Sequence, residues 1–230
     1  SCMHKRGPNT VGGYTTQEEH DNCPAIVNKQ RVQDLMVARY GECVEHRPPP
    51  PPPGEHGHSL VQVHVDVVSS GGVTGHTTYQ LSLATSAQVG NVYTIFGDGA
   101  SMMRFPPSQQ VSAPFGVDIG GVHPAIVENN PASAYDSWLT VGVSTGNAGN
   151  EISSIGIDFS SWNDRTELRV SDGAVFWMSP DNGPRATSVL IAQVTVASGE
   201  EWHASVSAQG RSTSSGADWS ATGIEFISSA

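Results

Sequence analysis

A strict alternation of apolar and polar residues constrains the fold of this chain more than any other feature of its sequence. Val61, Val63, Val65 and Val67 are separated by single polar residues, and a period of two is that of a β-strand with one apolar face. Further short runs follow, most of them bounded by Gly, Asn, Asp or Ser: "HTTYQLSLA", "NVYTIFGDG", "DSWLTVGVSTG", "SSIGIDFSSW", "GAVFWMSPDNGP", "TSVLIAQVTVASG", "EWHASVSAQG" and "ATGIEFIS". This spacing is typical of a β-sandwich or β-barrel. The sequence therefore predicts an all-β, jelly-roll-like β-sandwich over residues 59–230.

One region interrupts this pattern. Between Ser101 and Pro131 the chain contains several prolines, which exclude a continuous central strand because proline cannot donate to a ladder. They are Pro106, Pro107, Pro114, Pro124 and Pro131. We predict a long connection here that lies over one face or end of the sandwich.

Six consecutive prolines precede the first predicted strand. Such a run favours the polyproline II conformation, which rises about 3.1 Å per residue and gives a stiff rod of roughly 19 Å. Residues 48–58 are therefore predicted to be a spacer, and residues 1–47 an N-terminal arm. The rod also resembles hydroxyproline-rich glycoproteins, a likeness that implies hydroxylation and O-glycosylation of Pro48, Pro49, Pro50, Pro51, Pro52 and Pro53.

The arm contains one helical pattern, which predicts a short helix from about Ala25 to Tyr40. The apolar residues that share one face of this helix are Val32, Leu35, Met36 and Tyr40. With so few apolar residues the arm cannot bury a core of its own. We expect it to dock through this face on another surface.

All three cysteines lie in the arm, at Cys2, Cys23 and Cys43. In an oxidising compartment two of them would form a disulfide, and the third would bond to another chain or stay a free thiol. The alternative is three reduced thiols in an intracellular protein. The spacing lacks the paired C-x-x-C ligands of a closed zinc site.

The charge of the chain excludes some classes of partner. The formal net charge is -11 at pH 7, and the only lysines are Lys5 and Lys29. Such a balance repels nucleic acid and anionic lipid, and no apolar stretch approaches the roughly 20 residues that span a bilayer. We expect neither nucleic-acid binding nor membrane insertion. The chain starts at Ser1, which fits a processed, secreted, extracellular protein and equally fits a shortened chain.

Several patterns offer groups that could perform chemistry. Glu55, His56 and His58 are potential metal ligands in a glycine-rich linker, and the Asp/Asn-rich loops offer oxygen ligands for calcium, but linker and turn chemistry explain both more simply. Asp158 and Glu225 are carboxylates within apolar runs, as in a polysaccharide hydrolase, yet nothing in the sequence brings them together. We predict no catalytic residue, no metal ligand and no cofactor.

The tryptophans suggest one binding function. Trp138 and Trp177 lie within apolar runs and are predicted to pack in the core. Trp162 and Trp219 lie among polar residues, and exposed indoles on a sandwich stack against sugar rings. These two residues are therefore a possible glycan platform.

The stretch from about Tyr79 to Phe226, with "NVYTIFGDG", "APFGVDIGG", "YDSWLTVG", "SSIGIDF", "GAVFWMSPD" and "GADWSATGIEF", resembles uncharacterised secreted β-sandwich modules of aquatic microbes. The order of arm, spacer and sandwich also resembles subunits of extracellular fibres that join head to tail by donating an N-terminal segment. This second likeness implies a structural protein whose partners are other copies of itself, assembled into filaments by the arm. A monomeric glycan-binding adhesin is the main alternative, and a polysaccharide hydrolase is a further one.

Overall fold

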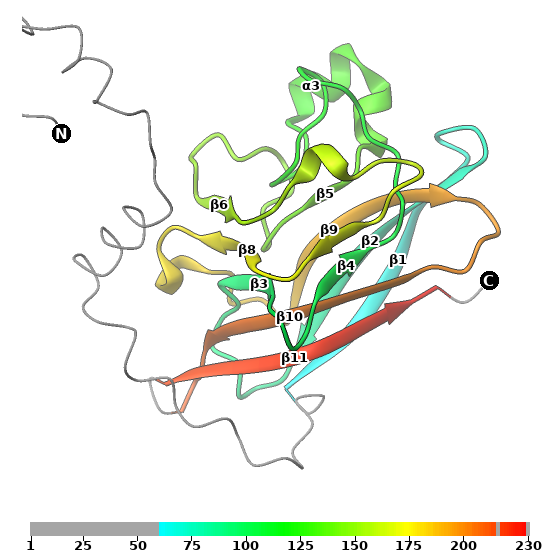
Figure 1. Cartoon of the computed structure of the whole chain (residues 1–230). Helices are drawn as coiled ribbons and strands as arrows, with labels where there is room; N and C mark the ends of the chain where they lie inside the picture. The colour runs from blue at the N-terminus through cyan, green and yellow to red at the C-terminus, as the bar shows by residue number, and fades with distance from the viewer. Residues whose placement is uncertain (1–59, 215–216, 229–230) are drawn as a thin grey trace, which may run out of the picture. The chain divides into compact units, whose positions relative to one another are not determined.

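The computed structural model describes residues 60–214 and 217–228 (Figure 1). The predicted arm helix, the three cysteines, the proline rod and the Glu55/His56/His58 group lie outside these described residues. The described residues form the sandwich whose first strand is the valine alternation.

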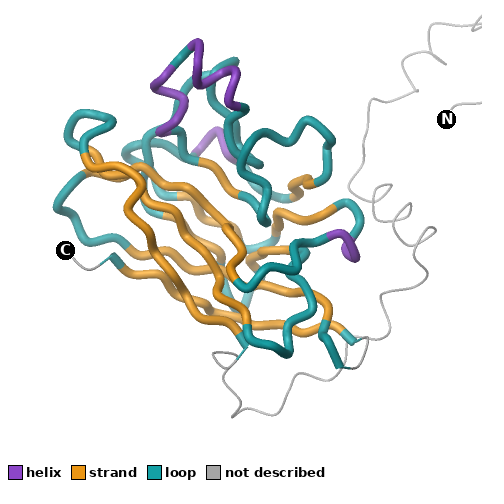
Figure 2. The backbone as a smooth tube through the Cα atoms, turned by 180° about the vertical axis from the view of Figure 1, so that it is seen from behind, coloured by secondary structure: helices purple, strands orange, loops and turns teal. Residues whose placement is uncertain are grey.

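Two sheets make up the described fold, and every pair of named strands is antiparallel. The four-stranded sheet, which we call the β1 sheet, has the order β1 (Val61–Ser70), β2 (His76–Thr85), β9 (Ser188–Ala197), β5 (Trp138–Leu139). The seven-stranded β10 sheet has the order β6 (Ile152–Ile155), β8 (Gly173–Trp177), β3 (Thr94–Gly97), β10 (His203–Arg211), β4 (Met103–Phe105), β7 (Leu168–Val170), with β11 (Asp218–Ile227) also paired to β10. Strands dominate the described chain (Figure 2), which confirms the predicted all-β sandwich.

The hydrophobic core lies between the two sheets because both present apolar side chains to the same interior. Its largest fully buried side chains are Phe105, Phe226, Leu81, Leu83, Ile95, Met103, Leu139, Ile152, Leu168, Ile191, Val92 and Val141. These residues come from strands of both sheets and from the segments beside them. The sandwich thus has a core made of its own residues.

The long connection confirms the interpretation of its prolines. Residues 106–123 contain no named strand, and the only strand within the region is the three-residue β4. Pro124 and Pro131 each stand at the start of a short helix, where a proline costs no backbone hydrogen bond. The short helices of the described chain are α3 (Pro124–Asn129), η2 (Pro131–Tyr135), η3 (Phe159–Ser161) and η4 (Pro180–Asn182).

The end of this connection covers the outward face of the β1 sheet. The side-chain amide of Gln193 donates to the carbonyls of Ala134 and Asp136, at 3.0 and 2.8 Å. The ring of Tyr135 lies directly over Gly72 in the β1–β2 turn, within 2.3 Å of where a Cβ would stand. Gly72 is therefore a position where any side chain would displace the cover.

None of the described helices is long enough to span a bilayer, since the longest α-helix among them has six residues.

Candidate functional site

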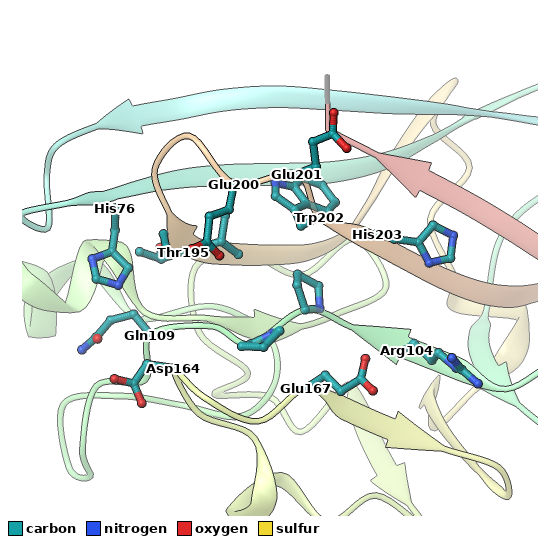
Figure 3. Close-up of a pocket in the computed structure, with 14 residues that line it drawn as sticks. His76, Arg104, Gln109, Asp164, Glu167, Thr195, Glu200, Glu201, Trp202 and His203 are labelled. Atoms are coloured by element: carbon teal, nitrogen blue, oxygen red, sulfur yellow. The ribbon is translucent and has the colours of Figure 1, made fainter. Parts of the chain in front are cut away.

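A cavity of about 270 Å³ opens where residues of both sheets meet the loops at 106–109 and 164–167. Its charged side chains are Arg104, Asp164, Glu167, Glu200 and Glu201, with His76 and His203 beside them. Figure 3 shows His76, Gln109 and Asp164 at one end and Glu167, Arg104 and His203 towards the other. The cavity is thus a hollow in which carboxylates outnumber the guanidinium.

The carboxylates of the cavity do not resemble a catalytic pair. Asp164, Glu200 and Glu201 are exposed, and Glu167 is only half-buried. Solvent reaches these groups, whereas a catalytic general acid commonly lies in a largely buried site. The apolar wall contains Trp202, whose buried indole Nε1 has no hydrogen-bond partner.

The two carboxylates considered for hydrolysis serve other purposes. Asp158 Oδ1 accepts hydrogen bonds from the Ser160 backbone N–H and hydroxyl and caps η3. Glu225 lies on β11 with its Oε1 3.7 Å from Nε2 of His203. Neither residue lines the cavity. Asp158 and Glu225 therefore form no pair at the cavity.

The Asp/Asn-rich loops use their side chains as turns. Asn147 exchanges hydrogen bonds with the backbone of Ile152, and Asn163 Oδ1 accepts the backbone N–H groups of Arg165 and Thr166. In the loop at residues 179–184, Asp181 accepts a hydrogen bond from the Arg211 guanidinium at 2.9 Å. No group of three or more metal-ligating side chains is found among the described residues.

The predicted glycan platform is wrong. Trp162 and Trp219 are only 3% and 6% exposed. The indole N–H of Trp162 donates to the Pro106 carbonyl at 2.8 Å, and that of Trp219 donates to the Asn91 carbonyl at 2.9 Å. Each indole is buried because its polar end has a backbone partner. Their polar neighbours in sequence belong to surface turns and do not report on the ring itself.

Trp138 and Trp177, which were predicted to pack in the core, are both in contact with it or within it. Trp138 is 3% exposed within β5. Trp177 is half-buried against the core, and its indole N–H donates to the Val141 carbonyl.

Asp136 has the largest pKa shift among the acidic residues of the described chain, yet its role is structural. Its carboxylate accepts the backbone N–H groups of Val111 and Val117, at 2.8 and 2.7 Å, and so pins the long connection. Burial raises the pKa of Asp136 to about 6, against the effect of these donors, which lower it, and with a smaller contribution from the nearby charge of Asp118. Both oxygens are engaged and the side chain is fully buried, so no substrate reaches it.

Strand β1 is the second candidate surface. The alternating segment forms a strand as predicted, but its apolar face is largely uncovered. Val63 pairs with Leu83, and Val65 with Leu81, so the valines face the same side as the two leucines. Both leucines are fully buried, whereas Val63 is 43% exposed and Val67 is 60% exposed.

The opposite sheet reaches only part of β1. Strand β11 is the element of that sheet that lies near β1, and Val61 at the start of β1 is buried. From Val63 onward the opposite sheet covers much less of the apolar side chains, and Val65 is only half-buried. We call the residues Val63, Val65, Val67 and Val68, together with the outer backbone of their strand, the valine edge.

The valine edge lacks most devices that protect sheet edges. Proteins usually shorten an edge strand or place Lys or Pro on it. Edge strands β5, β6 and β7 are short, whereas β1 has ten residues without Lys or Pro. A bulge near Val68 interrupts its register with β2. The other ten-residue edge strand, β11, exposes mainly polar residues.

Comparison of the chain with models of known protein families, with curated proteins and with solved structures found no match. The sequence had indicated neither the cavity nor the exposure of the valine edge. The absence of Lys and Pro from residues 61–70 was the only signal of an unprotected edge.

Proposed function

We propose that this chain is an extracellular structural protein that self-assembles head to tail into filaments, with its N-terminal arm docking on a neighbouring copy. The valine edge is the observation that carries the proposal. It belongs to a ten-residue edge strand whose apolar side chains are largely uncovered on the side that faces the core. An edge of this kind is a template for pairing with another chain.

Composition adds to this support. Both lysines of the chain precede the sandwich, so no lysine is available there to discourage association between edges. The surface charge of the sandwich is mainly acidic, which keeps random copies apart and leaves pairing to specific contacts.

The arm supplies the contact that would propagate. A segment donated to the next copy makes a heterologous contact, which extends into a filament unless its rotation closes a ring. The rod at residues 48–53 would hold the arm away from its own sandwich and favour a neighbour. The cysteines of the arm would then link copies covalently in an oxidising compartment.

The glycan-binding alternative has lost its basis in the sequence, because Trp162 and Trp219 are core residues. For the hydrolase alternative, the two carboxylates that the sequence suggested, Asp158 and Glu225, do not line the cavity. Self-assembly is therefore the function that the described surface supports best.

Light scattering over a range of protein concentrations tests this function. We expect the full chain to grow beyond a dimer as concentration rises, and a chain starting at Gly54 not to do so. Circular dichroism of the shortened chain serves as a folding control, since the sandwich has its own core. A full chain that stays monomeric throughout, or a shortened chain that polymerises equally well, would contradict the proposal.

A further inference from the structure

We infer that β1 pairs antiparallel with β1 of a second copy, in the register that places Val65 opposite Val65 of that copy. The inference rests on the proposed self-assembly and assigns the valine edge to β1 of a second copy, so the arm would dock on another part of its neighbour. The arm makes a heterologous contact, whereas this pairing is isologous and closes at two copies.

The sequence of the valine edge is symmetric in kind. Residues 63–67 read Val-His-Val-Asp-Val. From either end, valine alternates with an ionisable residue, and one of the two ionisable residues is basic while the other is acidic. A two-fold axis midway between the two copies of Val65 therefore sets Val63 of one copy opposite Val67 of the other, and His64 opposite Asp66. Both copies contribute the same two pairs, so the contact contains each of them twice.

Neighbouring registers are worse. A register shifted so that position 64 lies on the axis sets His64 against His64, and a shift the other way sets Asp66 against Asp66. The shift that pairs Asp66 with Asp66 sets like charges directly opposite one another, which destabilises a strand pair, and the shift that pairs His64 with His64 loses the contact between His64 and Asp66. A slip by one residue places valines beside the polar face of the second copy. Of these registers, the one centred on Val65 sets valine opposite valine on one face and histidine opposite aspartate on the other.

The exposure of the side chains agrees with this register. Val67 and Val63, which would face each other, are 60% and 43% exposed. On the opposite face of the strand, Nε2 of His64 lies 3.0 Å from Oδ1 of Asp66, with both side chains 59% exposed. Pairing would cover the valines. It would also place each His64 beside Asp66 of its own strand and opposite Asp66 of the second copy.

The bulge sets a limit on the paired segment. The register between β1 and β2 is regular from Val61 to Val67 and shifts between Val67 and Ser69. The symmetric residues 63–67 all lie within the regular part. Two four-stranded β1 sheets would thereby join into one continuous sheet across the two-fold axis.

A charge exchange in the full chain tests the register. His64→Asp sets carboxylates opposite carboxylates, and we expect it to weaken the β1 contact about tenfold or more. The double variant His64→Asp/Asp66→His returns opposite residues to every pair and is expected to restore association to near the original strength. The dissociation constant is measured by analytical ultracentrifugation, and thermal melts verify that each variant folds. Association unchanged by the single variant, or unrestored by the double variant, would overturn the register.

A cross-link gives an independent readout. Cysteine at position 65 would face itself across the axis, so Val65→Cys is expected to form a 65–65 disulfide between copies on mild oxidation, identified by peptide mapping. Val63→Cys is the matched control, because position 63 faces position 67 and no 63–63 link is expected. A 63–63 link, or no 65–65 link, would overturn the inference.

The chain starting at Gly54 separates this inference from the proposed function. If β1 pairing holds, this shortened chain is a dimer. If it is monomeric while the full chain polymerises, the β1 contact fails and the arm-driven filament stands. If the full chain stops at a dimer that carries the 65–65 link, the filament fails and the β1 contact stands.

Discussion

The outward face of the β1 sheet and the valine edge invert the usual relation between polarity and burial. On the outward face, Thr78 and Thr195 are 1% and 0% exposed, although both are polar. On the valine edge, Val63 and Val67 are exposed although both are apolar. The comparison teaches that burial in this sandwich depends on which other part of the chain lies over a face.

The polar face tolerates burial because its side chains have partners. The hydroxyls of Thr78 and Thr195 are 2.8 Å apart across the strand pair. Gln193 bonds both Gln80 and the cover, which is η2 and the residues after it. A buried polar group that is hydrogen-bonded costs little, whereas an unpaired one costs about 1–3 kcal/mol.

The valine edge has no such cover among the described residues. Strand β11 lies near β1, yet only Val61 is buried there. The same inward direction thus contains buried leucines on β2 and largely uncovered valines on β1. A contact with another copy would remove the difference.

The largest effect expected from this comparison concerns the two neighbouring strands. Leu81→Ala leaves a cavity at a fully buried site and should lower the free energy of unfolding by about 2–5 kcal/mol. Val65→Ala, at the position paired with Leu81, should cost about 1 kcal/mol or less because that side chain is only partly covered. Urea denaturation of dilute protein measures both. Equal losses at the two positions would mean that β1 is covered after all.

The next effect concerns the cover itself and depends on pH. The folded carboxyl of Asp136 has a pKa of about 6, above its value of roughly 3.9 in an unfolded chain. The folded state therefore binds this proton more tightly, and its stability falls as pH rises from about 4 to about 6. The change from this group is about 3 kcal/mol, at roughly 1.4 kcal/mol for each pKa unit.

Asp136→Asn should remove that part of the pH dependence, because an amide does not titrate in this range. The variant is expected to be less stable overall, since an amide oxygen replaces only one of two acceptors for Val111 and Val117. Asp98→Asn is the matched control, because Asp98 also accepts two backbone N–H groups, in an exposed turn. If the free energy of unfolding of the Asp136 variant still falls between about pH 4 and pH 6 as steeply as that of the original chain, the assignment is refuted.

The sequence located most of the strands, though not β4 and β7, and it did not reveal their surroundings. Alternation located β1 and β2, and the prolines located the connection, because both signals are local. The burial of Trp162 and Trp219 depends on backbone carbonyls 56 and 128 positions away. The exposure of the valine edge depends on how far the opposite sheet extends. Neither property can be inferred from the neighbouring residues.

A smaller effect tests the polar pair beneath the cover. Thr78→Val alone should cost about 1–3 kcal/mol, because it leaves the buried Thr195 hydroxyl without its partner. The double variant Thr78→Val/Thr195→Val replaces both hydroxyls by methyl groups of similar size and should be less destabilising than the single one. Denaturant titrations of the two single variants and the double variant form the cycle. Additive losses would show that the two hydroxyls do not depend on each other.

The smallest expected effect on folding belongs to the valine edge, and there the sharper readout is association. Val67→Thr keeps the β-branched shape at a position that is 60% exposed, so the free energy of unfolding should change by less than about 0.5 kcal/mol. Self-association should nevertheless weaken several-fold, because a hydroxyl replaces a methyl group at the paired edge. Ile155→Thr, on edge strand β6 and 40% exposed, is the matched control and should leave association unchanged. If the two variants weaken association equally, the apolar contact is not specific to β1, and the contrast with the covered polar face has no functional meaning.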